Sequence, residues 1–222
     1  MYNIAVILAG GTGSRVGGTT PKQLLPLADG RSVLEHSIEA FEQAPCIDEI
    51  AVVMHPDWME EAKALVESHS WDKVRTIIPG GNERWESSWH AILAYSSTGE
   101  QSALWFHDAA RPFVSQRILA DVAEALEQHE AVTVAIPVTD TLYHIADSQV
   151  KDIPARSEYM RAQTPQAFHY DVVFGAYAQA IADEELRATD DVGVVRKYAP
   201  KQKIFIVEGE ESNRKITYKE DL

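Results

Sequence analysis

The chain has 222 residues, 45% hydrophobic and 24% charged, which is the composition of an ordinary globular protein with enough length for a sizeable core. Its 34 acidic and 20 basic side chains give a formal net charge of −14, which argues against nucleic acids and anionic membranes as partners. The single cysteine, Cys46, excludes an intramolecular disulfide framework and a multi-cysteine metal site. The N-terminal run MYNIAVILAGG has no basic segment and is too short for a signal peptide or a membrane span, so we expect a cytoplasmic protein.

Apolar runs and helical patterns alternate along the chain. Strands are predicted at 3–8, 49–54, 74–78, 102–107, 131–138 and 203–207. Helices are predicted near 32–43, 57–69, 83–97, 115–129, 170–182 and 190–198. Because parallel neighbours need a helical crossover, this rhythm predicts an α/β fold with a doubly wound, mainly parallel sheet of the Rossmann-like type. We expect residues 1–222 to form a single domain.

The alternation breaks at residues 139–160, TDTLYHIADSQVKDIPARSEYM. Alternating apolar residues around a polar turn at 147–149 predict a β-hairpin that no helix covers. One interpretation is a flap that folds onto the same subunit. The other is a protruding β-arm that packs on a second subunit, and this interpretation predicts a homodimer.

A glycine-rich loop follows the first strand, in the segment 8–23, LAGGTGSRVGGTTPKQ. The backbone N–H groups around Gly10, Gly11 and Gly13 can cradle phosphate oxygens. The loop departs from the dinucleotide-binding fingerprint, which needs a third glycine where this chain has Val16, and it lacks the GK[ST] ending of phosphate loops.

Two cations accompany this loop. Arg15 can hold phosphate oxygens in a bidentate manner, and Lys22 adds a mobile point charge. Both would serve nucleotidyl transfer, because negative charge develops on the departing pyrophosphate. The alternative is that they are solvated surface cations beside a turn.

Further segments follow the loop in order. They are GGNERWES at 80–87, HDAARPF at 107–113, VTDT at 138–141, RSEYMRAQTPQAF at 156–168, TDD at 189–191 and NRKIT at 213–217. Together with the loop, they resemble the 2-C-methyl-D-erythritol 4-phosphate cytidylyltransferases and the related ribitol-5-phosphate cytidylyltransferases over nearly the whole chain. The resemblance implies a transferase that joins CMP from CTP to a polyol phosphate, with Mg²⁺ as cofactor and release of pyrophosphate.

The resemblance implies that the glycine-rich loop and the segment 80–87 form the nucleotide pocket. Arg84 would help to orient the loop at 80–87. The residues implied to bind the nucleotide are Ala9, Gly10, Gly11, Gly13, Gly81, Asn82, Arg84 and Ser87. Taken without the resemblance, Gly80, Gly81 and Asn82 would indicate only a turn and a helix cap.

Catalytic roles are implied for Arg15, Lys22 and Lys215, which would gather charge on the reacting phosphates. Asp108 follows a predicted strand at the edge where doubly wound sheets bind ligands, and there it would help to hold Mg²⁺. The alternative for Asp108 is a helix cap. We interpret His107 as a packed side chain at the end of the strand.

Substrate binding is implied for Asp108 and for four further residues. Arg111 would face the polyol or its phosphate. Thr141, Arg156 and Thr164 would grip the substrate phosphate, with the hairpin crossing to a partner subunit. The alternative for Arg156 is a surface ion pair with a neighbouring acidic side chain.

The identity of the polyol is less specific than the family. HDAARP and TDD favour the methylerythritol enzymes, whereas the paired Gly10-Gly11 and Ser212-Asn213 favour the ribitol-phosphate enzymes. Many relatives carry an acidic residue where this chain has Ser212. We also expect Asn213 and Lys215 to share one face of a strand. We favour 2-C-methyl-D-erythritol 4-phosphate as the acceptor.

Two other classes of protein remain as alternatives. A nicotinamide-dependent oxidoreductase should carry an acidic residue at the end of the second strand, where this chain has Met54-His55-Pro56. A non-catalytic nucleotide-binding module could keep the base pocket and lose the cations, but both Arg15 and Lys22 are present.

Overall fold

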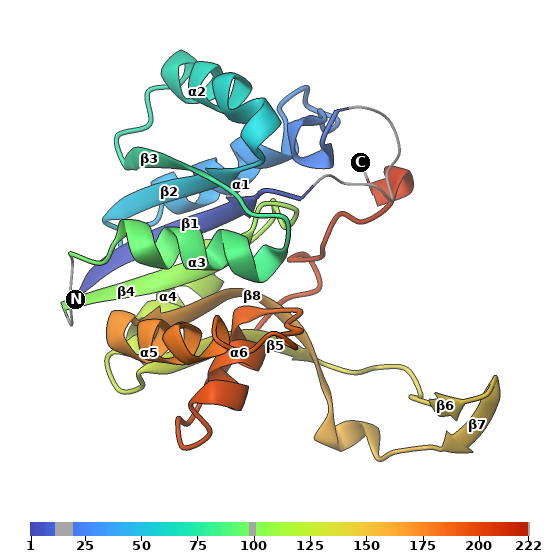
Figure 1. The fold of residues 1–222 in the computed structure, drawn as a ribbon. Helices are drawn as coiled ribbons and strands as arrows, with labels where there is room; N and C mark the ends of the chain where they lie inside the picture. Colours follow the sequence, from blue (N-terminus) through green and yellow to red (C-terminus); the bar gives the residue numbers. More distant parts are fainter. Residues whose placement is uncertain (12–19, 98–100, 222) are drawn as a thin grey trace.

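The structure, a computed structural model, describes residues 1–11, 20–97 and 101–221. Its centre is a seven-stranded sheet with the strand order β3-β2-β1-β4-β8-β5-β9 (Figure 1). The strands are β1 (Tyr2–Ala9), β2 (Glu49–Met54), β3 (Val74–Pro79), β4 (Ser102–Asp108), β5 (Ala131–Pro137), β8 (Met160–His169) and β9 (Phe205–Glu208). All neighbours pair in parallel except β8, which runs antiparallel to both β4 and β5.

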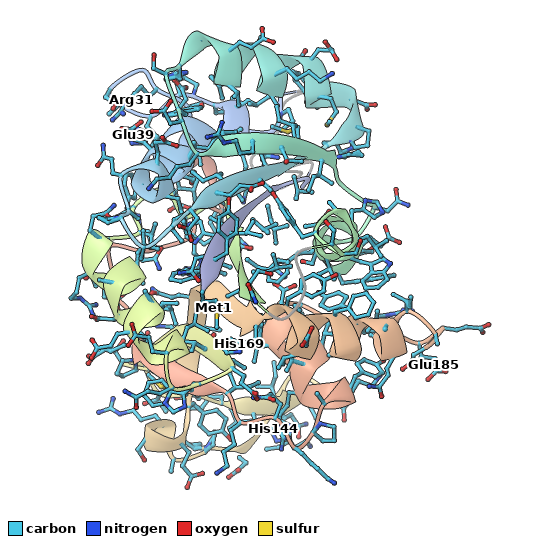
Figure 2. All side chains as sticks on the ribbon, turned by 90° about the vertical axis from the view of Figure 1, so that its left-hand side faces the viewer. Met1, Arg31, Glu39, His144, His169 and Glu185 are labelled. Atoms are coloured by element: carbon cyan, nitrogen blue, oxygen red, sulfur yellow. The ribbon has the colours of Figure 1, made fainter. Side chains whose placement is uncertain are left out.

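Helices cover both faces of the sheet and bury a separate apolar cluster on each. One face packs against α1 (Val33–Glu42), α2 (Met59–Ser68) and α4 (Gln116–Leu126). The other packs against α3 (Arg84–Ala94), α5 (Tyr170–Ala180) and α6 (Asp191–Tyr198). Figure 2 shows the two helical layers on either side of the sheet, with side chains filling the space between. The doubly wound α/β architecture predicted from the sequence is confirmed.

The local sequence explains where these elements begin and how they pack. Residues Ile4 to Ile7 of β1 are completely buried, as expected for a strand covered on both faces. Helix α1 begins at a capping box in which Ser32 and Glu35 bond each other's backbone N–H groups. Its apolar stripe, which includes Leu34 and Ile38, faces the sheet.

The strand order reverses beside β1, and this places the candidate site. From β1 the chain builds outward through β2 and β3, then returns to add β4 on the other side of β1. Leu8 therefore pairs with Asp108, and the Ala109 N–H donates to the Leu8 carbonyl at 3.1 Å. Ligands of doubly wound sheets bind where such a reversal leaves a crevice at the carboxyl ends of the strands.

The predicted hairpin is confirmed. It consists of β6 (His144–Ala146) and β7 (Gln149–Asp152), paired antiparallel in a sheet of their own. Asp147 and Ser148 at its turn have φ of 51° and 59°, the left-handed pair that favours tight hairpins. The hairpin extends away from the body of the molecule (Figure 1).

The sequence analysis missed one strand and predicted another that does not form. The ten residues of β8 form a strand inside the main sheet, which the sequence analysis did not predict because Gln163, Thr164, Pro165 and Gln166 interrupt its apolar pattern. The three polar side chains are nevertheless buried, each with hydrogen-bond partners, so a polar strand could enter the core. Conversely, the residues 213–216 form no strand.

The remaining helices and strands agree with the prediction to within a few residues at their ends. The expected helix near 57–69 is a short 3-10 turn, Pro56–Trp58, followed by α2. In the part of the chain that the structure describes, no helix combines the length and apolar character needed to cross a membrane.

Candidate active site

A cavity of about 220 Å³ lies at the carboxyl ends of β1 and β4. Four segments distant in the sequence meet there: the glycine-rich loop, the start of α3, the end of β4 and the C-terminal segment. The lining residues are Leu8, Gly10, Gly11, Lys22, Gln23, Gly81, Asn82, Glu83, Arg84, Ser87, Asp108, Ala109, Ala110, Lys215 and Thr217. The cavity is therefore formed by residues from both of the sequence segments implied to bind the nucleotide.

One wall of the cavity is backbone, and it depends on glycines. A Cβ added at Gly80 would lie 3.3 Å from the Gly10 Cα and 3.1 Å from the Ser87 Oγ. A Cβ at Gly81 would overlap the Glu86 side chain. Ser87 is buried, and its hydroxyl accepts the Gly81 N–H at 3.1 Å. The close approach of these loops places peptide groups of Gly10, Gly11 and Gly81 on the cavity wall, and we call this glycine-lined part of the cavity the slot.

Helix α3, which begins at this slot, is capped in a way that the sequence analysis did not predict. Its N-cap is Glu83, in a capping box with Glu86, and not Asn82. The Glu86 carboxylate also accepts the Asn82 N–H at 2.6 Å. Asn82 is exposed at the mouth of the slot. A helix-capping role therefore does not occupy the Asn82 side chain.

Gln23 is a site residue that the sequence analysis missed. It is buried, and its side-chain amide donates to the carbonyl of Ala9 and, at 2.7 Å, to that of Gly11. These two bonds hold the described start of the glycine-rich loop against the short 3-10 turn Lys22–Leu24. The PKQ sequence carries the available signal, because Gln23 directly follows the cation Lys22.

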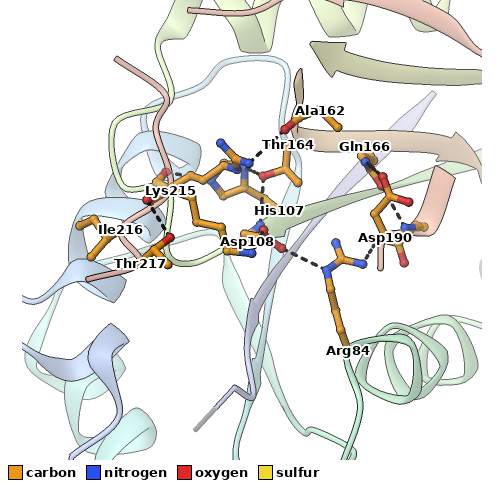
Figure 3. Close-up of polar contacts among 12 residues, drawn as sticks. Arg84, His107, Asp108, Ala162, Thr164, Gln166, Asp190, Lys215, Ile216 and Thr217 are labelled. Atoms are coloured by element: carbon orange, nitrogen blue, oxygen red, sulfur yellow. Dashed lines mark hydrogen bonds and ion pairs between the residues drawn. The ribbon is translucent and has the colours of Figure 1, made fainter. Parts of the chain in front are cut away.

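Another part of the cavity lining carries charge, centred on Asp108 (Figure 3). The Arg84 Nε lies 3.1 Å from Asp108 Oδ1, and the Lys215 Nζ lies 2.7 Å from Asp108 Oδ2. Burial alone would raise the pKa of Asp108, but the Arg84 and Lys215 cations outweigh it and hold that pKa far below its usual range. Asp108 is therefore an ionised carboxylate. Its side chain bonds Arg84 and Lys215 and does not cap a helix.

Arg84 also reaches a second carboxylate, on helix α6. Its Nη1 lies 2.7 Å from the Oδ2 of Asp191, whose side chain is completely buried. We expected Arg84 to orient the loop at 80–87, but the described contacts of its guanidinium are with these two acids. The guanidinium thus connects the end of β4 with the start of α6.

A neutral network lies directly behind Asp108. The Asp108 N–H donates to the Thr164 hydroxyl at 3.1 Å, and that hydroxyl lies 3.0 Å from His107 Nδ1. On its other side, His107 Nε2 lies 3.0 Å from the Arg111 carbonyl. The side chain of His107 is fully buried, which lowers its pKa to about 4. His107 is a packed side chain at the end of its strand, as predicted, and its lowered pKa keeps the ring neutral at pH 7.

The C-terminal segment 209–217 is fastened to the site by backbone contacts. Lys22 Nζ donates to the Ile216 carbonyl at 2.7 Å, and Arg111 donates to the Asn213 carbonyl at 2.8 Å. The Asn213 side chain is buried and donates to the Thr164 carbonyl at 2.8 Å. These contacts, and not a strand, hold Lys215 beside Asp108.

The structure brings most of the predicted residues together. Gly10, Gly11, Lys22, Gly81, Asn82, Arg84, Ser87, Asp108 and Lys215 line the cavity, and Ala9, Arg111 and Thr164 lie directly behind its wall or beside it. Thr141 and Arg156 do not line it: both are exposed on the protruding segment, where Arg156 donates to the Thr139 carbonyl at 2.6 Å. The predicted residues Gly13 and Arg15 lie outside the described residues.

A divalent cation would find one main protein ligand here. Among the described residues, no three acidic, histidine or cysteine side chains gather as a complete metal site. Asp108 lines the cavity as an ionised carboxylate. Mg²⁺ commonly takes one or two carboxylates and completes its shell with substrate phosphates and water. The donor set therefore fits a cation that arrives with a triphosphate, and does not fit a cation caged by protein alone.

Comparison with known proteins agrees with this geometry. The sequence profile of the 2-C-methyl-D-erythritol 4-phosphate cytidylyltransferases, IspD, matches residues 3–222. The enzyme of that name from Thermobifida fusca is 43% identical, over 98% of this chain and 89% of its own length. The ribitol-5-phosphate cytidylyltransferase from Lactiplantibacillus plantarum is 36% identical, over 98% of this chain and 94% of its own.

Solved structures give the same answer. The crystal structure of 4-diphosphocytidyl-2C-methyl-D-erythritol synthase from Anaerococcus prevotii superposes with a TM-score of 0.85 at 30% identity, covering 99% of this chain and 92% of that one. Sequence and structure thus agree over nearly the full length. The chain belongs to the IspD family of CTP:polyol-phosphate cytidylyltransferases.

Proposed function

We propose that this protein transfers CMP from CTP to 2-C-methyl-D-erythritol 4-phosphate and releases pyrophosphate. The observation that carries the proposal is the cavity itself, which is lined both by the glycine-rich slot and by the charged group of Lys22, Arg84, Asp108 and Lys215. A base and a polyphosphate need opposite surroundings, and this cavity offers both within one small volume.

In the proposed complex, the cytosine and ribose of CTP lie in the slot. Backbone groups of Gly10, Gly11 and Gly81, with Asn82 and Ser87, would bond the edge of the pyrimidine. Sites that hydrogen-bond a ligand's polar edge reject the wrong ligand strongly, because buried polar groups would otherwise lose their partners. Gln23 supports this wall by fixing the loop backbone from behind.

The reaction needs positioning and charge more than acid–base chemistry. The phosphate oxygen of the acceptor is ionised at neutral pH and attacks the α-phosphorus of CTP in line with the bond to the departing pyrophosphate. Lys22, Lys215 and Arg15 would stabilise the negative charge that builds on the phosphorus and the leaving group. Arg111 would orient the acceptor phosphate beside them, and Thr164 would support this part of the site from behind through its bond with the Asp108 N–H.

We propose Mg²⁺ as the cofactor, held by Asp108 together with phosphate oxygens of CTP. When bound, the cation would neutralise charge on the triphosphate. Asp108 has the right chemistry because it stays ionised beside two cations. Lys215 now lies 2.7 Å from one of its oxygens, so this ammonium is already next to the phosphates that the cation would bring.

The choice of acceptor rests on sequence. The Thermobifida fusca methylerythritol enzyme is 43% identical to this chain and the Lactiplantibacillus plantarum ribitol enzyme 36%. HDAARP at 107–112 and TDD at 189–191 also favour methylerythritol phosphate. The second candidate is ribitol 5-phosphate, which Gly10-Gly11 and Ser212-Asn213 favour.

We also propose a homodimer in which the β-arm completes the partner's site. The arm is exposed on both sides, with Tyr143, Ile145, Val150 and Ile153 each more than half exposed. A two-stranded hairpin alone is marginal in water, and two-fold pairing would bury these side chains. The same pairing would carry Thr141 and Arg156 toward the second cavity.

Steady-state kinetics with the two acceptors test the proposal. We expect kcat/KM to be at least about tenfold higher with methylerythritol phosphate than with ribitol phosphate, the scale of roughly 1.4 kcal/mol in transition-state binding. A preference for ribitol phosphate would establish the second candidate. Binding of NADH without turnover of CTP would contradict both.

A further inference from the structure

Two residues outside the cavity lining support Arg84, Asp191 by direct contact and Tyr177 through Asp191. Asp191, at the first position of α6, accepts Arg84 Nη1 at 2.7 Å and the Tyr177 hydroxyl of α5 at 2.6 Å. Both residues are completely buried. The contacts form a line from Tyr177 through Asp191, Arg84 and Asp108 to Lys215.

The line is anchored at its buried end. The backbone N–H of Asp191 donates at 3.0 Å to the side-chain carbonyl of Gln166, in strand β8. Gln166 in turn donates at 2.7 Å to Asp190, which caps α6 (Figure 3). The Asp191 carboxylate is therefore held by its own backbone and by the Tyr177 hydroxyl, and it is a fixed point against which Arg84 can be oriented.

The charges around Arg84 determine how the fixed Asp191 carboxylate affects the site. Arg84 and Lys215 balance Asp108 and Asp191, so the Arg84 guanidinium is shared between two acids. A guanidinium prefers a bidentate fork to a carboxylate when one is in reach. If Asp191 stopped holding Nη1, Arg84 could turn both arms of its fork onto Asp108. It would then compete with Lys215 for Asp108 Oδ2.

We propose that Asp191 and Tyr177 are positioning residues, which restrict Arg84 to one oxygen of Asp108 and leave the other oxygen to Lys215. The effect on catalysis rests on the proposed function, whereas the fixed orientation of the Arg84 guanidinium does not. Arg84 Nη2 is buried without a hydrogen-bond partner among the described residues, so the orientation of the guanidinium depends on its other two nitrogens.

The test compares two buried tyrosines of the same helix. Tyr177→Phe removes the hydroxyl that holds Asp191 and keeps the ring. Tyr170→Phe is the matched control: Tyr170 is also buried in α5, and its hydroxyl donates at 2.9 Å to the Ile92 carbonyl, away from Arg84. Each change removes one buried hydrogen bond, but the bond to the Asp191 carboxylate is charge-assisted, so Tyr177→Phe should cost more stability than Tyr170→Phe.

Two measurements separate positioning from stability. For Tyr177→Phe we expect kcat to fall about tenfold while KM for CTP stays within twofold. Losses of this size are typical when a residue that hydrogen-bonds a site residue is removed. For Tyr170→Phe we expect kcat and KM to change by no more than twofold. Asp191→Asn, which removes the charge at the same shape, should lower kcat about a hundredfold. By NMR, exchange of the Arg84 Nε–H with solvent should quicken in Tyr177→Phe and Asp191→Asn, and not in Tyr170→Phe.

Equal kcat and equal exchange in the two tyrosine variants would overturn the inference. Faster exchange without loss of kcat would also overturn it, because Arg84 would then move without consequence for the reaction. If wild-type protein transfers CMP to neither polyol phosphate, the proposed function fails, and the Arg84 exchange rates alone decide whether Tyr177 and Asp191 fix the guanidinium.

Discussion

Acidification should destabilise the fold through His107, and the size of the effect follows from its burial. The neutral ring fits its surroundings: Nε2 donates to the Arg111 carbonyl, and Nδ1 accepts from the Thr164 hydroxyl, each at 3.0 Å. A proton added at Nδ1 would face the hydroxyl proton and leave one donor without an acceptor. Burial accordingly lowers the pKa of His107 from 6.5 to about 4.

The sign of this pH dependence follows from the protonation of His107 in the unfolded and folded states. Below pH 6.5 the unfolded chain binds a proton at His107 and the folded chain does not, so stability present above pH 6.5 is lost as the pH falls toward 4. From these two pKa values we expect His107 to remove about 2.5 kcal/mol of unfolding free energy between pH 7.5 and pH 4.5.

The assay is urea unfolding at pH 7.5, 6.0, 5.0 and 4.5 for wild type, His107→Gln and the exposed control His144→Gln. Carboxylates that titrate over this range contribute equally to all three proteins and cancel in the differences. His107→Gln should be less stable than wild type at pH 7.5, and the gap should narrow by about 2.5 kcal/mol at pH 4.5. A gap that stays constant with pH, or that narrows equally in His144→Gln, would refute the burial argument.

Three further predictions concern the site. Lys22→Ala should lower turnover about 10²–10³-fold, the scale for one preorganised transition-state donor, whereas the exposed control Lys201→Ala should not; a loss under threefold would remove Lys22 from the reacting phosphates. Asp108→Asn should raise the Mg²⁺ concentration for half-maximal rate about tenfold, because an amide is a poorer ligand for a hard cation, and an unchanged titration would contradict the metal role. Equal amounts of Lys22→Ala and Arg156→Ala protein, after subunit exchange, should recover about a quarter of wild-type activity, since half of the dimers hold one intact site of two; no recovery despite proven exchange would contradict composite sites.

The sequence predicted the fold wherever burial followed a simple period. The runs at β1, β2 and β4 are apolar because helices cover both faces, and their positions were correct. Strand β8 did not obey this rule. Its buried glutamines are satisfied by the 209–213 backbone and by the start of α6, partners far away in the sequence. No local sequence pattern predicts hydrogen-bond partners that lie so far away in the chain.

The same distinction applies to the site, between residues that motifs predicted and residues whose roles depend on contacts across the fold. Motifs placed Asp108, Arg84 and Lys215 in one cavity, as the structure has them. Gln23 and Asp191 stood inside quoted motifs, but their roles depend on which backbone or guanidinium they reach across the fold. Lys215 lies beside Asp108, but the strand predicted for its segment is absent, and backbone contacts hold the segment in place.

Cytidylyl transfer itself can be followed directly by ³¹P NMR of CTP, Mg²⁺ and 2-C-methyl-D-erythritol 4-phosphate mixed with the wild-type protein. We predict that the three CTP resonances and the acceptor monophosphate resonance decline together, while inorganic pyrophosphate and a diphosphate diester appear in equal amounts. A spectrum in which CTP persists with both methylerythritol and ribitol phosphates, or loses only its terminal phosphate, would contradict the proposed reaction.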